Sequence, residues 1–340
     1  SCDRECFNLF SLVAAPKENW ITSTPWQPLP ERNYLHHCYH VNLDTRATIM
    51  GDDLLERCLS RLSHASHPPE LIILFDSCLH RLIGYDFQQP LDRFRRESAI
   101  PVVYYDIRTS QHPYLQQMKE FWKDVYLQTA DASRAPVPGR VSFLGFHPEI
   151  KEEIALLLEA VGLEAGARLF PHLPLEELRD IRSSSLIVAC DWEYVRILFS
   201  TMLPALDRPS LRLPLPYGVE GTTRWLERIV DAAGQDPAAV GRLEQVERAR
   251  TQARRHARAL AGARIGLFLR ARGACNQLSS SLRFGVPLVD FLHELGMGLD
   301  LNLFVGQDES PPDPESLRPA GIDRDRGDSI GFYSDFRDLP

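Results

Sequence analysis

The sequence predicts an α/β protein made of two to three Rossmann-like parallel-sheet domains around a central cleft, with the third domain abbreviated. Three observations support this fold class. Short apolar runs at 71–75 and 100–105 alternate with stretches of helical periodicity, which is typical of parallel strands with helices on their faces. The alternation resumes after a proline-containing segment at 132–139. It starts a third time near residue 264 and fades after residue 305.

The first predicted unit comprises residues 1–135 and begins with an irregular segment rich in Trp, Pro and His. Over 52–63, apolar residues recur at helical spacing, and Pro68 follows where such a helix must end. The elements expected next are a strand at 71–75, a helix ending near residue 96, a strand at 100–105 and a helix at about 112–128.

The second predicted unit comprises residues 136–235 and follows a linker at 132–139. Its expected strands are at 141–144, 167–170 and 186–189, with an extended segment at 211–215. Its expected helices are at 150–161, 175–181 and 192–203, with a fourth after Gly221. Gly162 is expected just past the first of these helices, because glycine readily adopts the left-handed conformation that ends a helix. Two units of such similar construction are expected to face each other across a cleft.

The third predicted unit comprises residues 236–340. It opens with a long charged helix at 237–262, whose arginines are interpreted as a solvated face. The elements expected next are a strand at 264–269, a helix at 289–295 and a strand at 301–305. The acidic tail from residue 306 is rich in Asp, Pro, Arg and Ser and shows no apolar stripe, so the third α/β unit is expected to remain incomplete.

Composition excludes several classes of protein. The net charge of −8 implies no general affinity for nucleic acid or for an anionic membrane. No apolar run reaches the roughly 18 residues of a membrane span, and the N-terminus lacks the basic and apolar regions of a signal peptide. Seven dispersed cysteines, an odd number, do not resemble a disulfide scaffold. These features together predict a cytoplasmic protein in a reducing setting.

Common catalytic motifs are missing from the sequence. It holds no P-loop, no GxGxxG after a strand and no GxSxG. If ATP drives its chemistry, another protein must therefore hydrolyse it, and neither a nicotinamide cofactor nor a hydrolase mechanism is supported. Cys58, on an apolar helix face, and Cys275, expected in a loop, are interpreted as structural.

Two cysteines follow predicted strands at the edge where ligands bind in open α/β sheets. Cys78 follows the strand at 71–75, and Cys190 follows the strand at 186–189. A thiol at such an edge is a candidate metal ligand or nucleophile, and the alternative is a small buried hydrophobic residue. His112, in a loop after a strand, is a candidate proton donor near a redox site, with a surface histidine as the alternative.

Several short segments resemble, in the correct order, component 1 of nitrogenase and its relatives. The segment 76–86, DSCLHRLIGYD, resembles the family's Thr-Cys and Ile-Gly-Asp-Asp stretch, and 215–223, LPYGVEGTT, is similar to its Pro-x-Gly-x-x-x-Thr turn. The other matching segments are 6–10, 47–54, 100–102, 143–145, 159–162 and 294–297. The family includes dinitrogenase subunits, cofactor-assembly scaffolds and nitrogenase-like reductases. The stretch around Cys78 is also similar to 2-hydroxyacyl-CoA dehydratases, which explain the second half of the chain poorly.

The resemblance implies a set of iron–sulfur ligands. Cys6 and Cys78 match positions that hold a cluster at a subunit interface, either a 4Fe–4S cluster or one like the nitrogenase P-cluster. Cys2 and Cys38 are the candidates for a third ligand. Cys190 falls where cofactor-binding subunits place the thiolate that holds a larger iron–sulfur cofactor. An acidic residue follows Cys190 and raises the pKa of a neighbouring thiol, so a core cysteine is the alternative there.

The resemblance also implies partners and an activity. The expected protein is an iron–sulfur subunit of a nitrogenase-like two-component reductase, in a heterotetramer-like complex with a homologous partner subunit. A separate, ATP-hydrolysing iron protein would supply the electrons. Two alternatives stay open, namely a non-catalytic scaffold for cofactor assembly and a cluster-free structural relative. Family members usually have a longer N-terminal region and a complete third domain, where one subunit type supplies a histidine to its cofactor.

Overall fold

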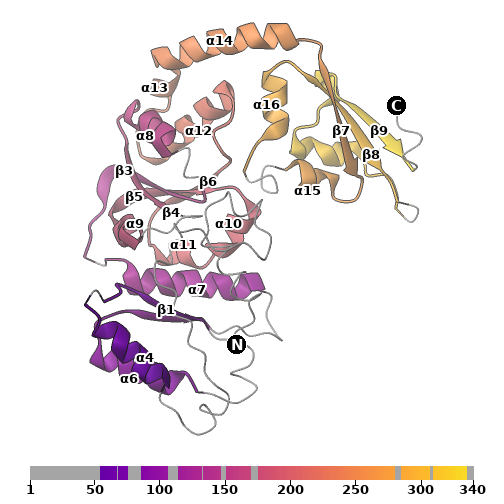
Figure 1. The fold of residues 1–340 in the computed structure, drawn as a ribbon. Helices are drawn as coiled ribbons and strands as arrows, with labels where there is room; N and C mark the ends of the chain where they lie inside the picture. The colour runs from indigo at the N-terminus through magenta and orange to yellow at the C-terminus, as the bar shows by residue number, and fades with distance from the viewer. Residues whose placement is uncertain are drawn as a thin grey trace.

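The structure of the chain is a computed structural model (Figure 1). It describes residues 54–66, 68–75, 86–105, 114–131, 133–146, 151–169, 175–279, 285–306 and 309–334. None of the helices in these ranges combines the length and the apolar character needed to cross a bilayer.

The described strands form three separate sheets in which every pair of neighbours is parallel. The sheet orders are β1-β2, β4-β3-β5-β6 and β7-β8-β9. The strands are β1 (Ile72–Phe75), β2 (Val102–Tyr105), β3 (Val137–Leu144), β4 (Glu164–Leu169), β5 (Ser184–Cys190), β6 (Ser210–Leu213), β7 (Arg264–Arg270), β8 (Gly298–Phe304) and β9 (Ser329–Tyr333). The predicted α/β class with parallel sheets is therefore confirmed.

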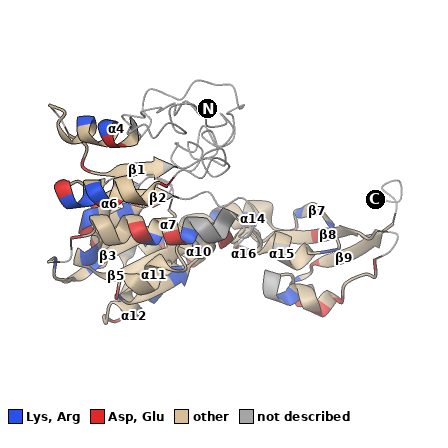
Figure 2. Cartoon of the chain, turned by 90° about the horizontal axis from the view of Figure 1, so that it is seen from below, with Lys and Arg blue, Asp and Glu red and all other residues tan. Residues whose placement is uncertain are grey.

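Helices connect these strands and cover the sheets. The α-helices are α4 (Leu54–Ser63), α6 (Gln88–Glu97), α7 (Tyr114–Thr129), α8 (Lys151–Glu159), α9 (Leu175–Asp180), α10 (Glu193–Leu198), α11 (Met202–Ala205), α12 (Val219–Ala232), α13 (Ala238–Gly241), α14 (Glu244–Leu260), α15 (Ala274–Leu278) and α16 (Leu288–Glu294). The 3-10 helices are η2 (Ile181–Ser183), η4 (Pro314–Ala320) and η5 (Arg324–Arg326). In Figure 2 the ribbon of the outer helices α4 and α6 is coloured for both basic and acidic residues.

The second sheet contains a change of direction that positions its functional edge. The chain runs from β3 outward to β4, then crosses back to β5 on the other side of β3 and continues to β6. Because such crossovers are right-handed, this order places helices on both faces. One apolar cluster contains residues of α8 and α12, and another contains residues of α7, α9, α10 and α11. The order reverses between β3 and β5, which makes their carboxyl ends the expected ligand edge.

Helix α7 lies between the first two sheets (Figure 1). Phe121, Trp122 and Tyr126 of α7 belong to one cluster with Val103 of β2 and Ile187 of β5. The first and second sheets therefore share a core through this helix. The division into units at 1–135, 136–235 and 236–340 stays a prediction, although each sheet lies within one of these ranges.

The third sheet has its own core. Leu299, Leu301 and Leu303 of β8 are fully buried beneath α15, α16 and η4. The tail contributes to this core, since Leu317 and Ile322 are buried and β9 adds a third strand. The tail thus adds two buried residues and a strand to the third unit, although its sequence shows no apolar stripe. Its apolar residues are spaced singly around short 3-10 turns, so they form no helical or alternating stripe in the sequence.

Other expected elements differ from the structure in their bounds. Strand β3 begins at Val137, inside the predicted linker, with a register irregularity before Val141. The helix expected at 192–203 is split into α10 and α11, because Pro204 cannot donate a backbone hydrogen bond to Ser200. The long helix expected at 237–262 is likewise split into α13 and α14. Cys275 lies on α15 and not in a loop.

Candidate functional site

Most of the predicted site residues lie outside the described ranges. Cys2, Cys6, Cys38, Cys78 and His112 are among them, so their predicted roles as ligands and proton donor stay predictions. In the part of the chain that the structure describes, no group of three or more His, Cys, Asp or Glu residues could hold a metal ion. Cys190 is the one predicted site residue that the structure places.

Cys190 lies at the reversal point of the second sheet. It is the last residue of β5, and its neighbour on β6 is Leu213. On the other side, Ala189 pairs with Leu144 at the end of β3. The sequence Ser184–Cys190 forms this central strand because its apolar residues can be buried on both faces of a parallel sheet. The thiol is therefore at the edge where the fold class binds ligands, as the sequence predicts.

The third unit closes this edge. Gly285, which has a φ of +85°, lies so close that a Cβ at this position would overlap the Cys190 sulfur. The backbone N–H of Leu215, just after β6, donates a 2.7 Å hydrogen bond to the Gly285 carbonyl. Only 1% of Cys190 is exposed. The thiol is therefore enclosed by the strand end and by a glycine from a different unit.

This enclosure determines the protonation of the thiol. Burial, with a smaller contribution from the charge of Asp191, raises the pKa of Cys190 to about 12. Iron–sulfur ligation requires a thiolate and space beside the sulfur. Gly285 fills the space beside the sulfur in this arrangement, so the surroundings of Cys190 do not fit a bound cluster. Ligation by Cys190 stays a prediction, and it requires Gly285 to move away.

A carboxylate from the third unit caps a helix beside the same edge. Glu294 of α16 accepts hydrogen bonds from the backbone N–H groups of Val219 at 2.6 Å and Glu220 at 3.2 Å. These are the first N–H groups of α12, which are left without partners inside the helix. Gly218, with a φ of +74°, lets the chain pass close to this carboxylate, because a Cβ there would overlap it. The cap joins two of the segments on which the family resemblance depends, 215–223 and 294–297.

Two further contacts support the junction between the second and third units. The rings of Tyr217 and Phe291 meet edge to face, with centroids 4.8 Å apart. Arg250 of α14 forms an ion pair with Glu220 at 2.9 Å, which lowers the pKa of Glu220. Sequence periodicity could not reveal the role of Glu294, because its partners lie 74 and 75 residues away in the chain. The only local signal was a helix start with glycine where a capping side chain usually stands.

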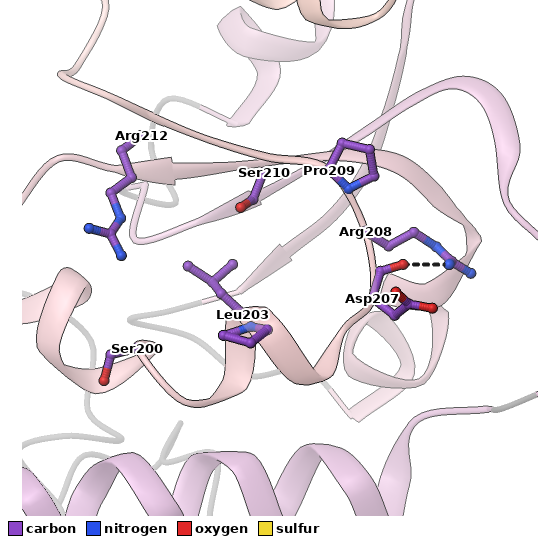
Figure 3. Close-up of a pocket in the computed structure, with 8 residues that line it drawn as sticks. Ser200, Leu203, Asp207, Arg208, Pro209, Ser210 and Arg212 are labelled. Carbon is purple, nitrogen blue, oxygen red and sulfur yellow. Dashed lines mark hydrogen bonds between the residues drawn. The ribbon is translucent and has the colours of Figure 1, made fainter.

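A surface pocket lies elsewhere on the second sheet (Figure 3). It has a volume of about 400 Å³ and adjoins the beginning of β6, whereas Cys190 neighbours its end. Its lining residues are Ser200, Leu203, Pro204, Asp207, Arg208, Pro209, Ser210 and Arg212. Arg208 donates to the carbonyls of Arg182 and Asp207, so its guanidinium is used within the fold. Nothing in the sequence pattern indicated this pocket.

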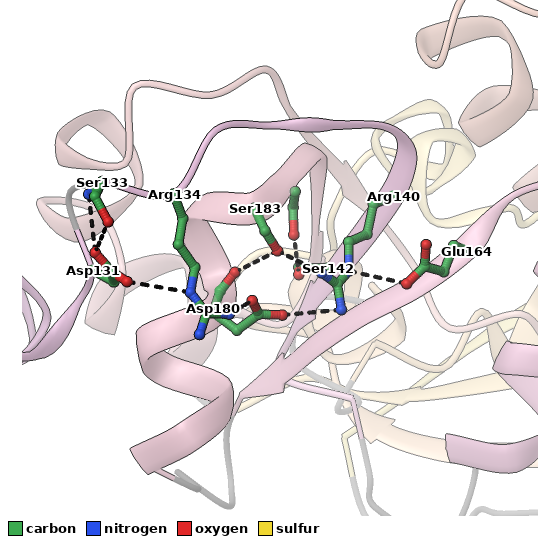
Figure 4. A network of polar contacts seen from close by, with 9 residues as sticks. Asp131, Ser133, Arg134, Arg140, Ser142, Glu164, Asp180 and Ser183 are labelled. Atoms are coloured by element: carbon green, nitrogen blue, oxygen red, sulfur yellow. Dashed lines mark hydrogen bonds and ion pairs between the residues drawn. The ribbon is translucent and has the colours of Figure 1, made fainter.

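A polar network fixes the amino ends of β3 and η2 (Figure 4). Asp180 pairs with Arg134 and, at 3.0 Å, with Arg140. Arg140 also donates to the Ser183 hydroxyl at 2.9 Å and pairs with Glu164 at 3.3 Å. The network lies at the opposite end of the strands from Cys190. It therefore stabilises the sheet and does not contribute to the ligand edge.

Comparisons with known proteins agree on one family. A family model for nitrogenase component 1 type oxidoreductases matches residues 6–304. The light-independent protochlorophyllide reductase subunit N of Rhodopseudomonas palustris (strain BisB18) is 39% identical over 92 residues, 26% of this chain and 19% of that protein. The same subunit from strain ATCC BAA-98 / CGA009 is 31% identical over 210 residues, 59% of this chain and 47% of that protein. The chain therefore spans about half the length of these curated relatives or less.

Solved structures show a similar fold. A structure of nitrogenase Cp1 at pH 5 has a TM-score of 0.57 and 14% identity, and the match covers 92% of this chain and 61% of that chain. A structure of nitrogenase Cp1 at pH 6.5 has a TM-score of 0.52 and 16% identity, covering 87% of this chain and 67% of that chain. At these identities the likeness shows the fold alone.

Proposed function

Since this chain belongs to the nitrogenase component 1 type oxidoreductases, we propose that it is the cluster-carrying subunit of a nitrogenase-like two-component reductase. The match of the family model over residues 6–304 carries the proposal, because it includes both Cys6 and Cys78. The chain is also similar to subunit N of light-independent protochlorophyllide reductases, which are reductases by name.

In this proposal Cys6 and Cys78 hold an iron–sulfur cluster at the interface with a homologous partner subunit. Cys2 or Cys38 completes the ligand set from this chain, and His112 donates protons near the cluster. Members of the family work with partner subunits and an iron protein, so the electrons reach this cluster from an ATP-hydrolysing iron protein. The complex is heterotetramer-like and cytoplasmic.

The proposal assigns the reducing site to the partner subunit. The enclosed thiol of Cys190 supports this assignment, because a larger cofactor there would need room beside the sulfur. The chain then relays electrons through the cluster and forms one side of the subunit interface. A cofactor at Cys190 would instead require the third unit to separate from the second.

The first experiment measures bound iron. The chain is co-expressed with its partner subunit and purified without oxygen, and iron and acid-labile sulfide are determined. Cys78→Ala is expected to lower both, whereas Cys58→Ala, a half-buried cysteine on α4, is expected to leave both unchanged. Equal iron content in the two variants would contradict cluster ligation by Cys78. An iron-free wild-type complex would favour the cluster-free relative.

The second experiment separates a reductase from a scaffold. The iron-containing complex is mixed with the iron protein, ATP and a reductant, and substrate reduction is followed. Protochlorophyllide is the first substrate to test, because it is the one named for the curated relatives. Activity supports the reductase. Transfer of the cluster to another apo-protein, without substrate reduction, would support the assembly scaffold.

A further inference from the structure

Among the residues that the structure describes, the strand order of the third sheet leaves one of its faces without helices. The order β7-β8-β9 advances in one direction, and right-handed crossovers in such an order all lie on the same face. The helices α15, α16 and η4 occupy that face in Figure 1 and cover its apolar cluster. The second sheet differs, because its reversal places helices on both faces. The uncovered face of the third sheet is called the open face below.

Parallel sheets are normally covered on both faces, so the open face lacks an expected neighbour among the described residues. Burial along β7 alternates between half-buried and exposed, whereas β8 is mostly buried. Phe268, in the middle of β7, points to the open face and is 56% exposed. Its exposed ring adds apolar area to a sheet face that has no second layer among the described residues.

Two aromatic rings form the apolar part of the open face, and this pair is called the aromatic floor below. The ring of Phe268 lies over Gly266, where a Cβ would stand 3.4 Å from the ring. The ring of Tyr333 lies over Gly331 in the same way, at 2.8 Å. Asn302, between them on β8, is 6% exposed and donates a 3.1 Å hydrogen bond to the Asp300 carbonyl. Two aromatic rings thus lie on either side of β8, where the side-chain amide of Asn302 already has a hydrogen-bond partner.

Among the described residues, the charged side chains of the open face are paired at its amino end and unpaired at its carboxyl end. At the amino end, Arg264 pairs with Asp300 at 2.6 Å, and Ser329 donates to the same carboxylate at 2.5 Å. At the carboxyl end, Arg270 is exposed and has no ion pair with any described residue. An occupant of this face would therefore meet an aromatic floor and a positive charge at one end.

The size of the face selects the kind of occupant. Three strands of up to seven residues span roughly 15 Å by 23 Å, a few hundred Å². A stable dimer needs about 800 Å² from each partner, so this face is too small to hold a second copy of the chain by itself. A single α-helix of about 15 residues has the matching length of about 23 Å.

We propose that the open face binds one amphipathic α-helix of a partner protein. Its apolar side chains contact Phe268 and Tyr333, and an acidic side chain pairs with Arg270. The helix supplies the layer that the crossovers within the described residues leave out. The proposal does not depend on the iron–sulfur cluster, so either can fail without the other.

The test uses fluorescently labelled helical peptides of about 15 residues, the length of the face. One peptide has leucines along one side and glutamates at both ends, and a second has lysines in place of the glutamates. Fluorescence anisotropy measures their binding to the full chain. The glutamate peptide is expected to bind the wild type with saturation and more tightly than the lysine peptide.

Three variants locate the binding site. Phe268→Asp is expected to raise the dissociation constant of the glutamate peptide at least roughly tenfold, because a central aromatic contact is lost. Arg270→Glu is expected to reverse the preference in favour of the lysine peptide. Leu156→Asp, at a position 65% exposed on α8, is the matched control and is expected to change nothing. All three positions are exposed, and circular dichroism checks that each variant is folded.

Two outcomes would overturn the proposal. One is a glutamate peptide that fails to bind, or that binds wild type and Phe268→Asp equally. The other is a wild-type chain that self-associates in analytical ultracentrifugation and becomes monomeric on Phe268→Asp, which would identify a second copy as the occupant.

Discussion

Glu294 accepts a 2.6 Å hydrogen bond from the backbone N–H of Val219, so a side chain of the third unit caps a helix of the second. The contact combines a carboxylate with the positive end of a helix dipole, which is a favourable pairing. It stands beside the place where Gly285 encloses Cys190. The cap and the enclosure therefore depend on the same placement of α16 against the second sheet.

Removing the cap is expected to loosen that placement. Glu294→Ala should lower the free energy of unfolding by about 1 kcal/mol, the usual cost of a lost cap, and Glu294→Gln by less because an acceptor oxygen remains. Alkylation of Cys190, followed by peptide mass spectrometry, should become faster in Glu294→Ala. Glu315→Ala, on an exposed surface pair, is the control. An unchanged alkylation rate would show that the cap does not hold the enclosure.

Two glycine variants separate the energetic effect of the Gly285–Cys190 contact from the cost of placing alanine in a left-handed backbone conformation. Gly285→Ala is expected to destabilise the fold by several kcal/mol, because the new methyl group overlaps the sulfur and φ is +85°. Gly234→Ala, where φ is +77° and nothing lies within 4 Å, should cost only about 1 kcal/mol. Chemical unfolding of both variants gives the difference. If both variants lost a similar amount of unfolding free energy, the contact between Gly285 and Cys190 would be easily broken.

The pKa of the Cys190 thiol predicts how stability changes with pH. The folded pKa is about 12 and the ordinary value is 9.0, so burial favours the neutral form. Above pH 9.0 the unfolded chain loses a proton that the folded chain keeps up to about pH 12. The contribution of the Cys190 thiol to the free energy of unfolding is therefore fully present below pH 9.0 and is lost as the pH rises toward 12. Cys190→Ala removes this loss, so its stability relative to wild type should rise in alkaline buffer.

A buried His–Asp pair should be essential for the third unit. The side chain of Asp328 is fully buried and accepts hydrogen bonds from His293 at 3.0 Å, the Leu299 N–H at 3.1 Å and the Asp323 N–H at 2.8 Å. Asp328→Ala leaves these donors without a partner and is expected to cost roughly 3–5 kcal/mol. Thermal unfolding measures the loss. The neighbouring Asp325→Ala, at a side chain 88% exposed, should cost almost nothing.

The elements that the sequence predicted well are those with strong local signals. The strands β1 and β5 are compact apolar runs, and Gly162 adopts the positive φ expected of a residue that ends a helix. The family resemblance, read from short phrases in order, is confirmed by the family model over residues 6–304. Each of these signals lies within a few neighbouring residues, so no knowledge of tertiary contacts was needed.

The features that the sequence did not predict depend on distant partners. The strand β9 exists because β8 offers a free edge, and its own five residues carry a weak apolar pattern. The edge position of Cys190 was predicted, but its enclosure by Gly285 depends on a contact between two units. The capping role of Glu294 follows from the same junction. Sequence periodicity reports which face of an element is buried and does not report what covers it.

Helix α14 has a consequence for how the molecule unfolds. It is 17 residues long, it connects the second and third sheets across the top of Figure 1, and none of its described side chains is buried. The apolar cluster of the third sheet shares no buried residue with the clusters of the other two. Apart from α14, the third sheet is joined to the second by the local contacts of Glu294 and Gly285 and not by a shared apolar core. The third sheet should therefore open as a separate unit under native conditions once those contacts break. Amide hydrogen exchange would then show three levels of protection: fastest exchange in α14, intermediate exchange in β7–β9, and slowest exchange in the central strands β3 and β5.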